Sequence, residues 1–156
     1  MVYVFDTSSL RVLGNYYPSR FPTFWRRFEP AVEAGSIRSV REVHRELELQ
    51  STKAWLKEWA GKHRALFAQP GPEETAFVAE IFRVPHFQAL IGKIQRLKGR
   101  PVADPFVVAA AKVMGGIVVT EEADRRNAAK IPNVCHHFGV GITNVEGFLE
   151  GNDWSF

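Results

Sequence analysis

The chain has 156 residues, of which 46% are hydrophobic and 24% are charged, proportions that are ordinary for a globular protein. Lys112 interrupts the longest apolar run, which stays short of the ~18 residues of a membrane span, and no signal-peptide pattern opens the chain. The one cysteine, Cys135, excludes an intramolecular disulfide and a CxxC-type zinc site. We therefore expect one cytoplasmic domain over residues 1–156 with no membrane partner.

The positive charge of the chain is small in total but uneven in its distribution. The formal net charge is +3 and the isoelectric point is near 9.2. Between Ile81 and Ala103 there is no acidic residue, whereas five basic residues fall there: Arg83, Lys93, Arg96, Lys98 and Arg100. Such a stretch is typical of a solvated basic face and is also compatible with a polyanionic partner.

The first residues of the chain combine a strand with a carboxylate. Residues 2–5 have the β-branched and aromatic composition of a buried strand, and Asp6 follows directly. Thr7, Ser8 and Ser9 come next and are residue types that begin helices. A carboxylate at the end of a strand lies at the sheet edge where open α/β folds bind ligands. Asp6 is therefore either a ligand-binding acid or a turn and capping residue.

The following region predicts two helices and a strand. A helix begins within residues 9–15, a second helix with an aromatic face covers residues 21–28 and ends by Gly35, and residues 36–40 form a short strand.

A capping-box pattern at Ser39 and Glu42 predicts the start of the next helix. Glu46 lies one turn after Glu42 on the same helix face. Capping gives Glu42 a structural task, whereas Glu46 has none and is the better candidate for chemistry. An exposed glutamate beside Arg45 is the alternative interpretation of Glu46.

The middle of the chain predicts scaffold helices over residues 55–61, 75–82 and 86–97. Asp104 and Pro105 are an N-cap followed by proline, a strong helix start. That helix closes at residues 115–116, and residues 117–120 form a second buried strand.

The acids Glu121, Glu122 and Asp124 follow this second strand directly. Residues 130–135 then pass from loop to a short helix, residues 140–143 form a last strand, and residues 145–149 form a terminal helix. Helices that alternate with short hydrophobic strands predict an α/β fold with a parallel sheet.

The predicted topology gathers acids that are far apart in the sequence. In a parallel sheet the strand C-termini and the helix N-termini meet at one edge, which brings Asp6, Asp104 and either Glu121 or Glu122 together with Glu46. Carboxylates held close together repel unless they are protonated or share a cation. Oxygen ligands with open positions suit Mg²⁺ or Mn²⁺, and a pair of such ions can promote phosphodiester hydrolysis.

These motifs resemble the PIN-domain family of metal-dependent ribonucleases, which includes the VapC toxins of toxin–antitoxin pairs. The likeness covers nearly the whole chain and is greater to a PIN-like subfamily of uncharacterised function. It is carried by residues 6–8, 43–47, 103–111 and 118–122, and by residues 130–135 and 139–145. The resemblance implies a three-layer α/β/α sandwich with a central parallel sheet of four to five short strands.

The resemblance also implies roles for individual residues. Asp6, Glu46, Asp104 and Glu122 would be the catalytic and metal-binding acids. The family's fourth acid is usually an aspartate in a Thr-x-Asp pattern, and here a glutamate with one more methylene takes its place.

Neighbouring residues have supporting or substitute roles in this interpretation. Ser8 and Thr120 would be hydroxyl supports, and Glu42, Glu121 and Asp124 are substitutes should the register differ. The basic residues expected to engage nucleic-acid phosphates are Lys93, Arg96, Lys98 and Arg100. The implied partners are an RNA substrate, an antitoxin protein and a second copy of the chain in a homodimer.

Other functions fit the sequence less well. A HAD-type phosphatase needs a second aspartate where Ser8 stands, and a receiver domain needs paired acids after its first strand. The adjacent His136 and His137 cannot easily point to one metal centre, so they are expected at or near the surface. The alternatives that stay open are a PIN-fold RNA- or protein-binding module without catalysis and a structure-specific DNA nuclease.

Overall fold

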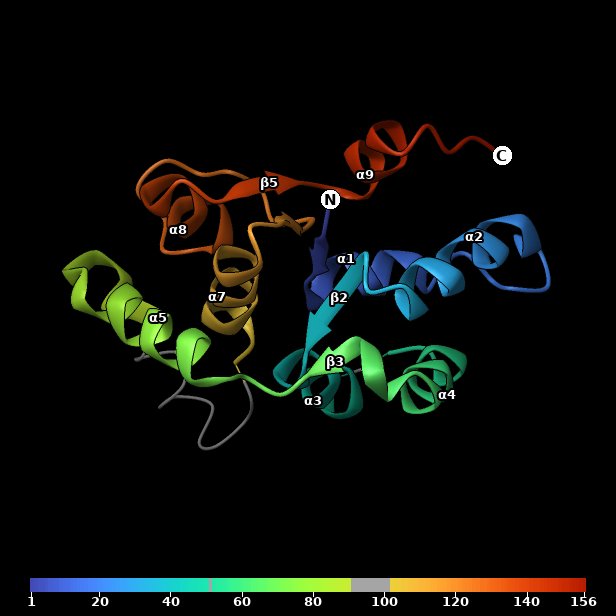
Figure 1. Ribbon diagram of the computed structural model, residues 1–156, viewed down its shortest axis with the longest axis horizontal. Coiled ribbons are helices and arrows are strands. Elements are labelled where there is room, and N and C mark those ends of the chain that lie inside the picture. Colours follow the sequence, from blue (N-terminus) through green and yellow to red (C-terminus); the bar gives the residue numbers. More distant parts are fainter. Residues whose placement is uncertain (51, 91–101) are drawn as a thin grey trace.

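A parallel sheet of five short strands lies at the centre of the computed structural model, which describes residues 1–50, 52–90 and 102–156 (Figure 1). The spatial order is β3-β2-β1-β4-β5. The strands are β1 (Tyr3–Phe5), β2 (Ile37–Val40), β3 (Phe67–Ala68), β4 (Ile117–Val119) and β5 (Gly141–Thr143). Helices cover both faces of this sheet, so the predicted α/β/α sandwich with a parallel sheet of four to five strands is confirmed.

Helices make up most of the remaining described chain. Helix α7 lies on one side of the sheet and α2 on the other (Figure 1). No helix of the described residues is both long enough and apolar enough to span a membrane. The helices are α1 (Thr7–Leu13), α2 (Pro22–Glu33), α3 (Arg41–Leu49), α4 (Ala54–Lys62), α5 (Pro72–Arg83), α7 (Asp104–Met114), α8 (Ile131–Phe138) and α9 (Val145–Gly151), with 3₁₀ turns at Arg64–Leu66 and Pro85–Gln88.

Strand β1 is buried on both faces, as its composition predicts. Tyr3 and Phe5 point to one face, because alternate residues of a strand share a face, and both pack edge-to-face on Phe148 of α9. Phe5 also packs on Phe28 of α2, with the ring centroids 5.6 Å apart. Val4 is fully buried and points to the opposite face, where α7 packs against β1. The core therefore holds the end of β1, and with it Asp6, in a fixed place.

The register of β1 and β4 decides which residues meet beyond the strand ends. Val4 pairs with Val118 and Phe5 with Val119, so Asp6 comes level with Thr120. The Asp6 amide donates to the Val119 carbonyl at 3.1 Å and continues the ladder. The two segments that carry the predicted acids thus leave the sheet side by side.

The N-caps predicted for α3 and α7 are each displaced by one residue. Ser39 belongs to β2, and its hydroxyl donates to the Phe5 carbonyl at 2.7 Å across the sheet, so Val40 is the N-cap of α3. The predicted capping box of Ser39 and Glu42 is therefore wrong. Ala103 is the N-cap of α7, which makes Asp104 the first helical residue.

Two further elements differ from the predicted ones. Strand β3 has only two residues and was not predicted, because a pair such as Phe67–Ala68 carries no periodicity. The predicted helix over residues 86–97 starts within the 3₁₀ turn at Pro85–Gln88, and its part from residue 91 onward lies outside the described residues.

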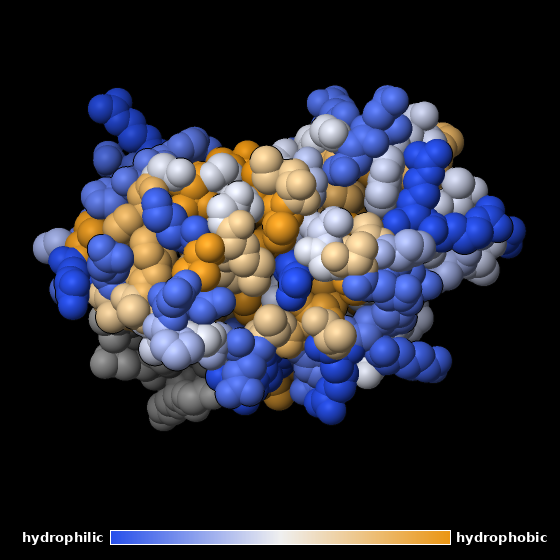
Figure 2. Space-filling view, viewed as in Figure 1, coloured by the Kyte–Doolittle hydropathy of each residue, from blue (hydrophilic) through white to orange (hydrophobic). Residues whose placement is uncertain are grey.

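The surface over α2 and α4 is mainly hydrophilic on the face shown in Figure 2.

We expect Gly116→Ala to destabilise the fold by about 1–3 kcal/mol, because an added Cβ would lie 2.6 Å from the Val2 carbonyl oxygen. Gly61→Ala is the matched control, since nothing lies within 4 Å of its added Cβ and alanine favours the helix by up to about 1 kcal/mol. Urea unfolding followed by tryptophan fluorescence measures both. A Gly116→Ala variant as stable as the wild type would contradict the close approach of β4 to Val2.

Candidate functional site

Four carboxylates from distant parts of the chain line one cleft of about 160 Å³. Asp6 follows β1, Glu46 lies on α3, Asp104 begins α7 and Glu122 follows β4. The cleft lies at the carboxyl edge of the sheet, where ligands bind in parallel α/β folds. The complete lining is Asp6, Thr7, Ser8, Arg11, Glu46, Gln50, Asp104 and Glu122.

The Asp6 side chain is only 4% exposed and is held by donors from both sides. It accepts from the Ser9 amide and the Ser8 hydroxyl at 2.8 Å, and from the Thr120 hydroxyl at 2.5 Å. The bond from Ser9 makes Asp6 the N-cap of α1. The capping residue and the cleft acid, which the sequence leaves as alternatives, are thus one and the same side chain.

The two hydroxyls also fix the segment after β4. The Ser8 hydroxyl oxygen accepts from the Glu121 amide at 2.9 Å, and the Thr120 hydroxyl oxygen accepts from the Glu122 amide at 3.1 Å. Each oxygen receives an N–H, which leaves its own hydrogen for the Asp6 carboxylate. The network therefore orients Asp6 and the backbone of Glu122 together.

Glu46 is buried and points toward the start of α7. Its Oε1 atom accepts from the Ala103 amide at 3.3 Å and from the Thr7 hydroxyl at 3.4 Å. The first amides of a helix carry positive partial charge, which favours a carboxylate there. This contact brings Glu46 beside Asp104, although 57 residues separate Glu46 from Ala103.

The two adjacent glutamates after β4 point to different places. Glu122 lines the cleft, and its Oε2 accepts from the Ile131 amide at the start of α8, at 3.0 Å. Glu121 is exposed and accepts from the Val145 amide at 2.7 Å, where it supports the start of α9. The structure thus places Glu122, and not Glu121, among the cleft acids.

The remaining substitute acids lie outside the cleft lining. Glu42 is buried and pairs with Arg41 at 3.0 Å, while its Oε2 has no hydrogen-bond partner among the described residues. Asp124 is exposed and pairs with His136 at 3.0 Å. Both His136 and His137 are exposed, as predicted.

The electrostatics of the cleft show that its negative charges are crowded. Burial raises the pKa of Asp6 above its usual range, and the hydrogen bonds to Thr120, Ser9 and Ser8 only partly offset this. Burial, followed by the charge of Asp104, raises the pKa of Glu122.

The charges of Asp6 and Glu122 also affect the pKa of the buried Cys135 thiol. Its pKa is raised to about 12, mainly by burial and further by Asp6 and Glu122. The folded cleft thus disfavours its own ionised form in the absence of a cation.

The donor chemistry of the cleft fits a hard divalent cation, since its acidic groups are all carboxylates. As the side chains stand, no three His, Cys, Asp or Glu side chains within residues 1–50, 52–90 and 102–156 converge closely enough to ligate one ion. Mg²⁺ typically takes only one or two carboxylates and keeps several waters. The arrangement therefore fits an ion that is bound partly through water.

Three cleft residues were not predicted from the sequence: Thr7, Arg11 and Gln50. Gln50 lies one helical turn beyond Glu46, and that spacing could have found it. Arg11 is close to Asp6 along α1 and donates to Gln50 Oε1 at 3.4 Å. The predicted phosphate-binding residues Lys93, Arg96, Lys98 and Arg100 lie outside the described residues.

The fold and the cleft define a parallel α/β protein with four carboxylates gathered at the carboxyl edge of its sheet. Residues 3–156 match the model of a family described as a domain of unknown function (DUF4411), and the chain belongs to that family. No curated protein matches the chain.

We expect Asp6→Asn to be more stable than the wild type near neutral pH in EDTA, because the folded state disfavours the ionised form of Asp6. Asparagine caps a helix as well as aspartate does, so α1 keeps its N-cap. Above the usual pKa of 3.8 the folded wild type holds protons more tightly than the unfolded chain, so its stability falls as pH rises through the raised pKa.

Thermal unfolding of both proteins from pH ~4 to ~7 measures this difference. The melting temperature of Asp6→Asn should exceed that of the wild type at neutral pH in EDTA, and this difference should disappear on acidification. At neutral pH with saturating Mg²⁺ or Mn²⁺ the wild type should instead have the higher melting temperature. A wild type that is more stable than Asp6→Asn at neutral pH in EDTA would contradict the electrostatic account.

Proposed function

We propose that the chain is a PIN-like ribonuclease that hydrolyses RNA phosphodiester bonds with Mg²⁺ or Mn²⁺. The observation that carries the proposal is the convergence of Asp6, Glu46, Asp104 and Glu122 on one cleft. Packing alone gives no reason to gather four carboxylates. Burial raises the pKa of Asp6, and burial together with the charges of Asp104 and Asp6 raises the pKa of Glu122, so both ionised forms are unfavourable without a counter-charge. A divalent cation supplies that charge.

Asp6, Asp104 and Glu122 would hold one or two ions, directly or through water. A bound ion of this kind lowers the pKa of water and stabilises the charge that develops on phosphate oxygens. The bonds from Ser8 and Thr120 keep the Asp6 carboxylate in one orientation before any ion binds.

Glu46 would orient the attacking water and accept its proton, or complete a second ion site. The oxygen of water then forms a bond to phosphorus, the phosphorus–oxygen bond to the leaving nucleotide breaks, and the leaving oxygen takes up a proton. The contacts of Glu46 with Thr7 and the Ala103 amide hold its carboxylate in the cleft for this task.

The resemblance to the VapC toxins extends the proposal to partners. In this view the chain is the toxin of a toxin–antitoxin pair, forms a homodimer, and is inhibited by a small protein that places a basic side chain in the acidic cleft. Light scattering on the purified protein should give twice the mass of the 17.6 kDa chain. A monomer at all concentrations would contradict the dimer but not the nuclease.

We expect purified protein to cleave RNA with Mg²⁺ or Mn²⁺ and to lose this activity in EDTA. Asp6→Asn and Asp104→Asn should each lower the rate by about 100-fold or more, because each removes a cleft charge. Asp153→Asn is the matched control: Asp153 is exposed, lies outside the cleft lining, and has a positive φ of 54° that asparagine tolerates. Structured and single-stranded RNA are tested beside the same DNA sequences, with oligonucleotide cleavage followed on gels.

The outcomes separate the proposal from its alternatives. Metal-dependent cleavage of DNA alone would support a DNA nuclease, and RNA binding without cleavage would support a non-catalytic module. Cleavage that survives both Asp6→Asn and Asp104→Asn would rule out the proposed site.

A further inference from the structure

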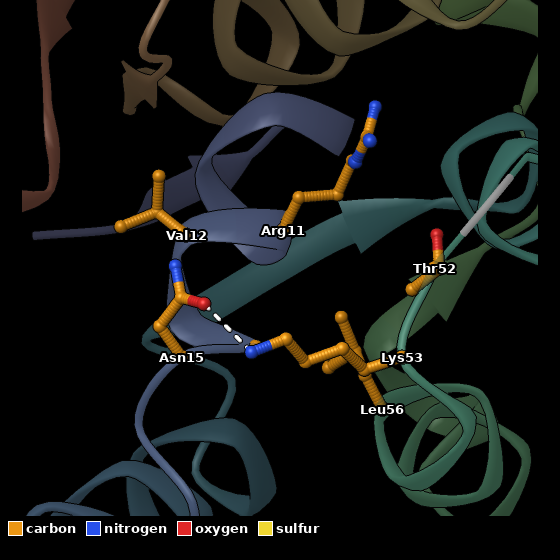
Figure 3. A pocket seen from close by; sticks show the side chains of 7 residues that line it. Arg11, Val12, Asn15, Thr52, Lys53 and Leu56 are labelled. Atoms are coloured by element: carbon orange, nitrogen blue, oxygen red, sulfur yellow. Dashed lines mark hydrogen bonds between the residues drawn. The ribbon is translucent and has the colours of Figure 1, made fainter.

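A second recess, of about 310 Å³, adjoins the acidic cleft and shares Arg11 with it. It lies between α1 and the start of α4. Figure 3 shows Arg11 and Asn15 on one side of it and Thr52, Lys53 and Leu56 on the other. Arg11 lines both hollows, so its side chain is within reach of a ligand in either of them.

Lys53 is held in place across the recess before any ligand binds. Its ammonium group donates to Asn15 Oδ1 at 2.8 Å, the bond drawn in Figure 3, and to the Tyr17 hydroxyl at 2.7 Å. An ammonium group has three donor hydrogens, so these bonds leave one for a ligand. Lys53 is exposed and forms no ion pair with a carboxylate of the described residues. It therefore offers an oriented positive charge.

Thr52 gives a second, independent indication of a polar ligand. Its hydroxyl oxygen is buried and has no hydrogen-bond partner among the described residues. An unsatisfied buried hydroxyl costs about 1–3 kcal/mol. Thr52 lines the same recess as Lys53, so a bound acceptor such as a phosphate oxygen beside Thr52 would give this hydroxyl a partner.

An aromatic ring lies beside this charge. The Tyr17 side chain is 42% exposed, with its ring centroid 4.5 Å from the Lys53 ammonium nitrogen and 6.2 Å from the ring of Trp55. Proteins that bind single-stranded nucleic acid combine positively charged side chains along the phosphate backbone with exposed aromatic rings on which the bases stack.

We propose that this recess is a binding subsite for the phosphodiester backbone of a single-stranded nucleic acid, next to the bond that the acidic cleft would cleave. This inference rests on the proposed nuclease function, because the cleft determines where the strand comes from. The acidic cleft by itself repels a polyanion. Arg11 and Lys53 supply attraction on one flank, and Tyr17 supplies a stacking surface for a base.

The test is fluorescence anisotropy of a short, labelled single-stranded RNA with Mg²⁺, in an Asp104→Asn background that prevents cleavage. Lys53→Gln should weaken binding roughly five- to tenfold at low salt and reduce the slope of log affinity against log salt by about 0.7, the share of one phosphate contact. Lys62→Gln is the matched control, because Lys62 is the last residue of α4, the helix that Lys53 precedes as N-cap, and it is exposed and lies outside the recess. It should change the affinity less than twofold.

Thr52→Val separates a ligand contact from a structural role. Removing an unsatisfied hydroxyl should keep or raise the melting temperature, whereas RNA affinity should fall. DNA of the same sequence should show the same dependence on Lys53, since the subsite recognises the backbone.

Failure of this inference differs from failure of the nuclease proposal. Equal affinity and equal salt slope for Lys53→Gln and Lys62→Gln would overturn the subsite, even in a protein whose wild type cleaves RNA. Loss of affinity in Lys53→Gln alone would support the subsite, and the cleavage assay of the wild type would then judge the nuclease separately.

Discussion

The carboxylate of Asp6 is buried at the end of the central strand, and the rest of the site is built around it. Its position follows from β1, whose aromatic side chains are fixed by α2 and α9 and whose register with β4 brings Thr120 level with it. Three donors hold the carboxylate in one orientation, yet its pKa is still raised. A buried acid whose ionised form stays unfavourable although three donors bond to it is a candidate for a functional group.

The neighbouring acids add to this constraint. Glu46 reaches the cleft from α3, where its carboxylate accepts from the amide of Ala103, the N-cap of α7, and from the Thr7 hydroxyl. Glu122 reaches it because its backbone is tied to the Thr120 hydroxyl and its carboxylate to the start of α8. Glu46 and Glu122 are thus each held by a main-chain amide at the start of a different helix, and the parallel sheet makes these elements meet at one edge. The recess beside α1 shares Arg11 with this cleft and has Lys53 in its lining.

Hydrophobic composition and strand order were enough to predict most of the fold and to bring Asp6, Glu46 and Asp104 to one edge of the sheet. The fourth acid was narrowed by them only to Glu121 or Glu122. The strands at β1 and β4 each end in a carboxylate, and a parallel sheet leaves little freedom in where these acids go. The errors have local causes. Ser39 matched a capping box, but its hydroxyl bonds across the sheet to Phe5, a contact between residues 34 positions apart that no local pattern reveals.

The choice between Glu121 and Glu122 could not be made from the sequence either. In an irregular segment, the directions of adjacent side chains depend on the groups around them. Here the Val145 amide donates to the Glu121 carboxylate and holds it outside the cleft. Lys53 and Thr52 were missed because a lone lysine at the start of a helix carries no signal. Their relevance appears only when α4 is seen beside α1.

The central proposal is that the four carboxylates of the acidic cleft share a divalent cation. Anomalous diffraction from crystals soaked in Mn²⁺ tests it most directly. The account predicts an anomalous peak in the cleft, within ligating distance of Asp6, Asp104 or Glu122. A cleft without a peak at saturating Mn²⁺, in crystals where the four side chains are ordered, would contradict it.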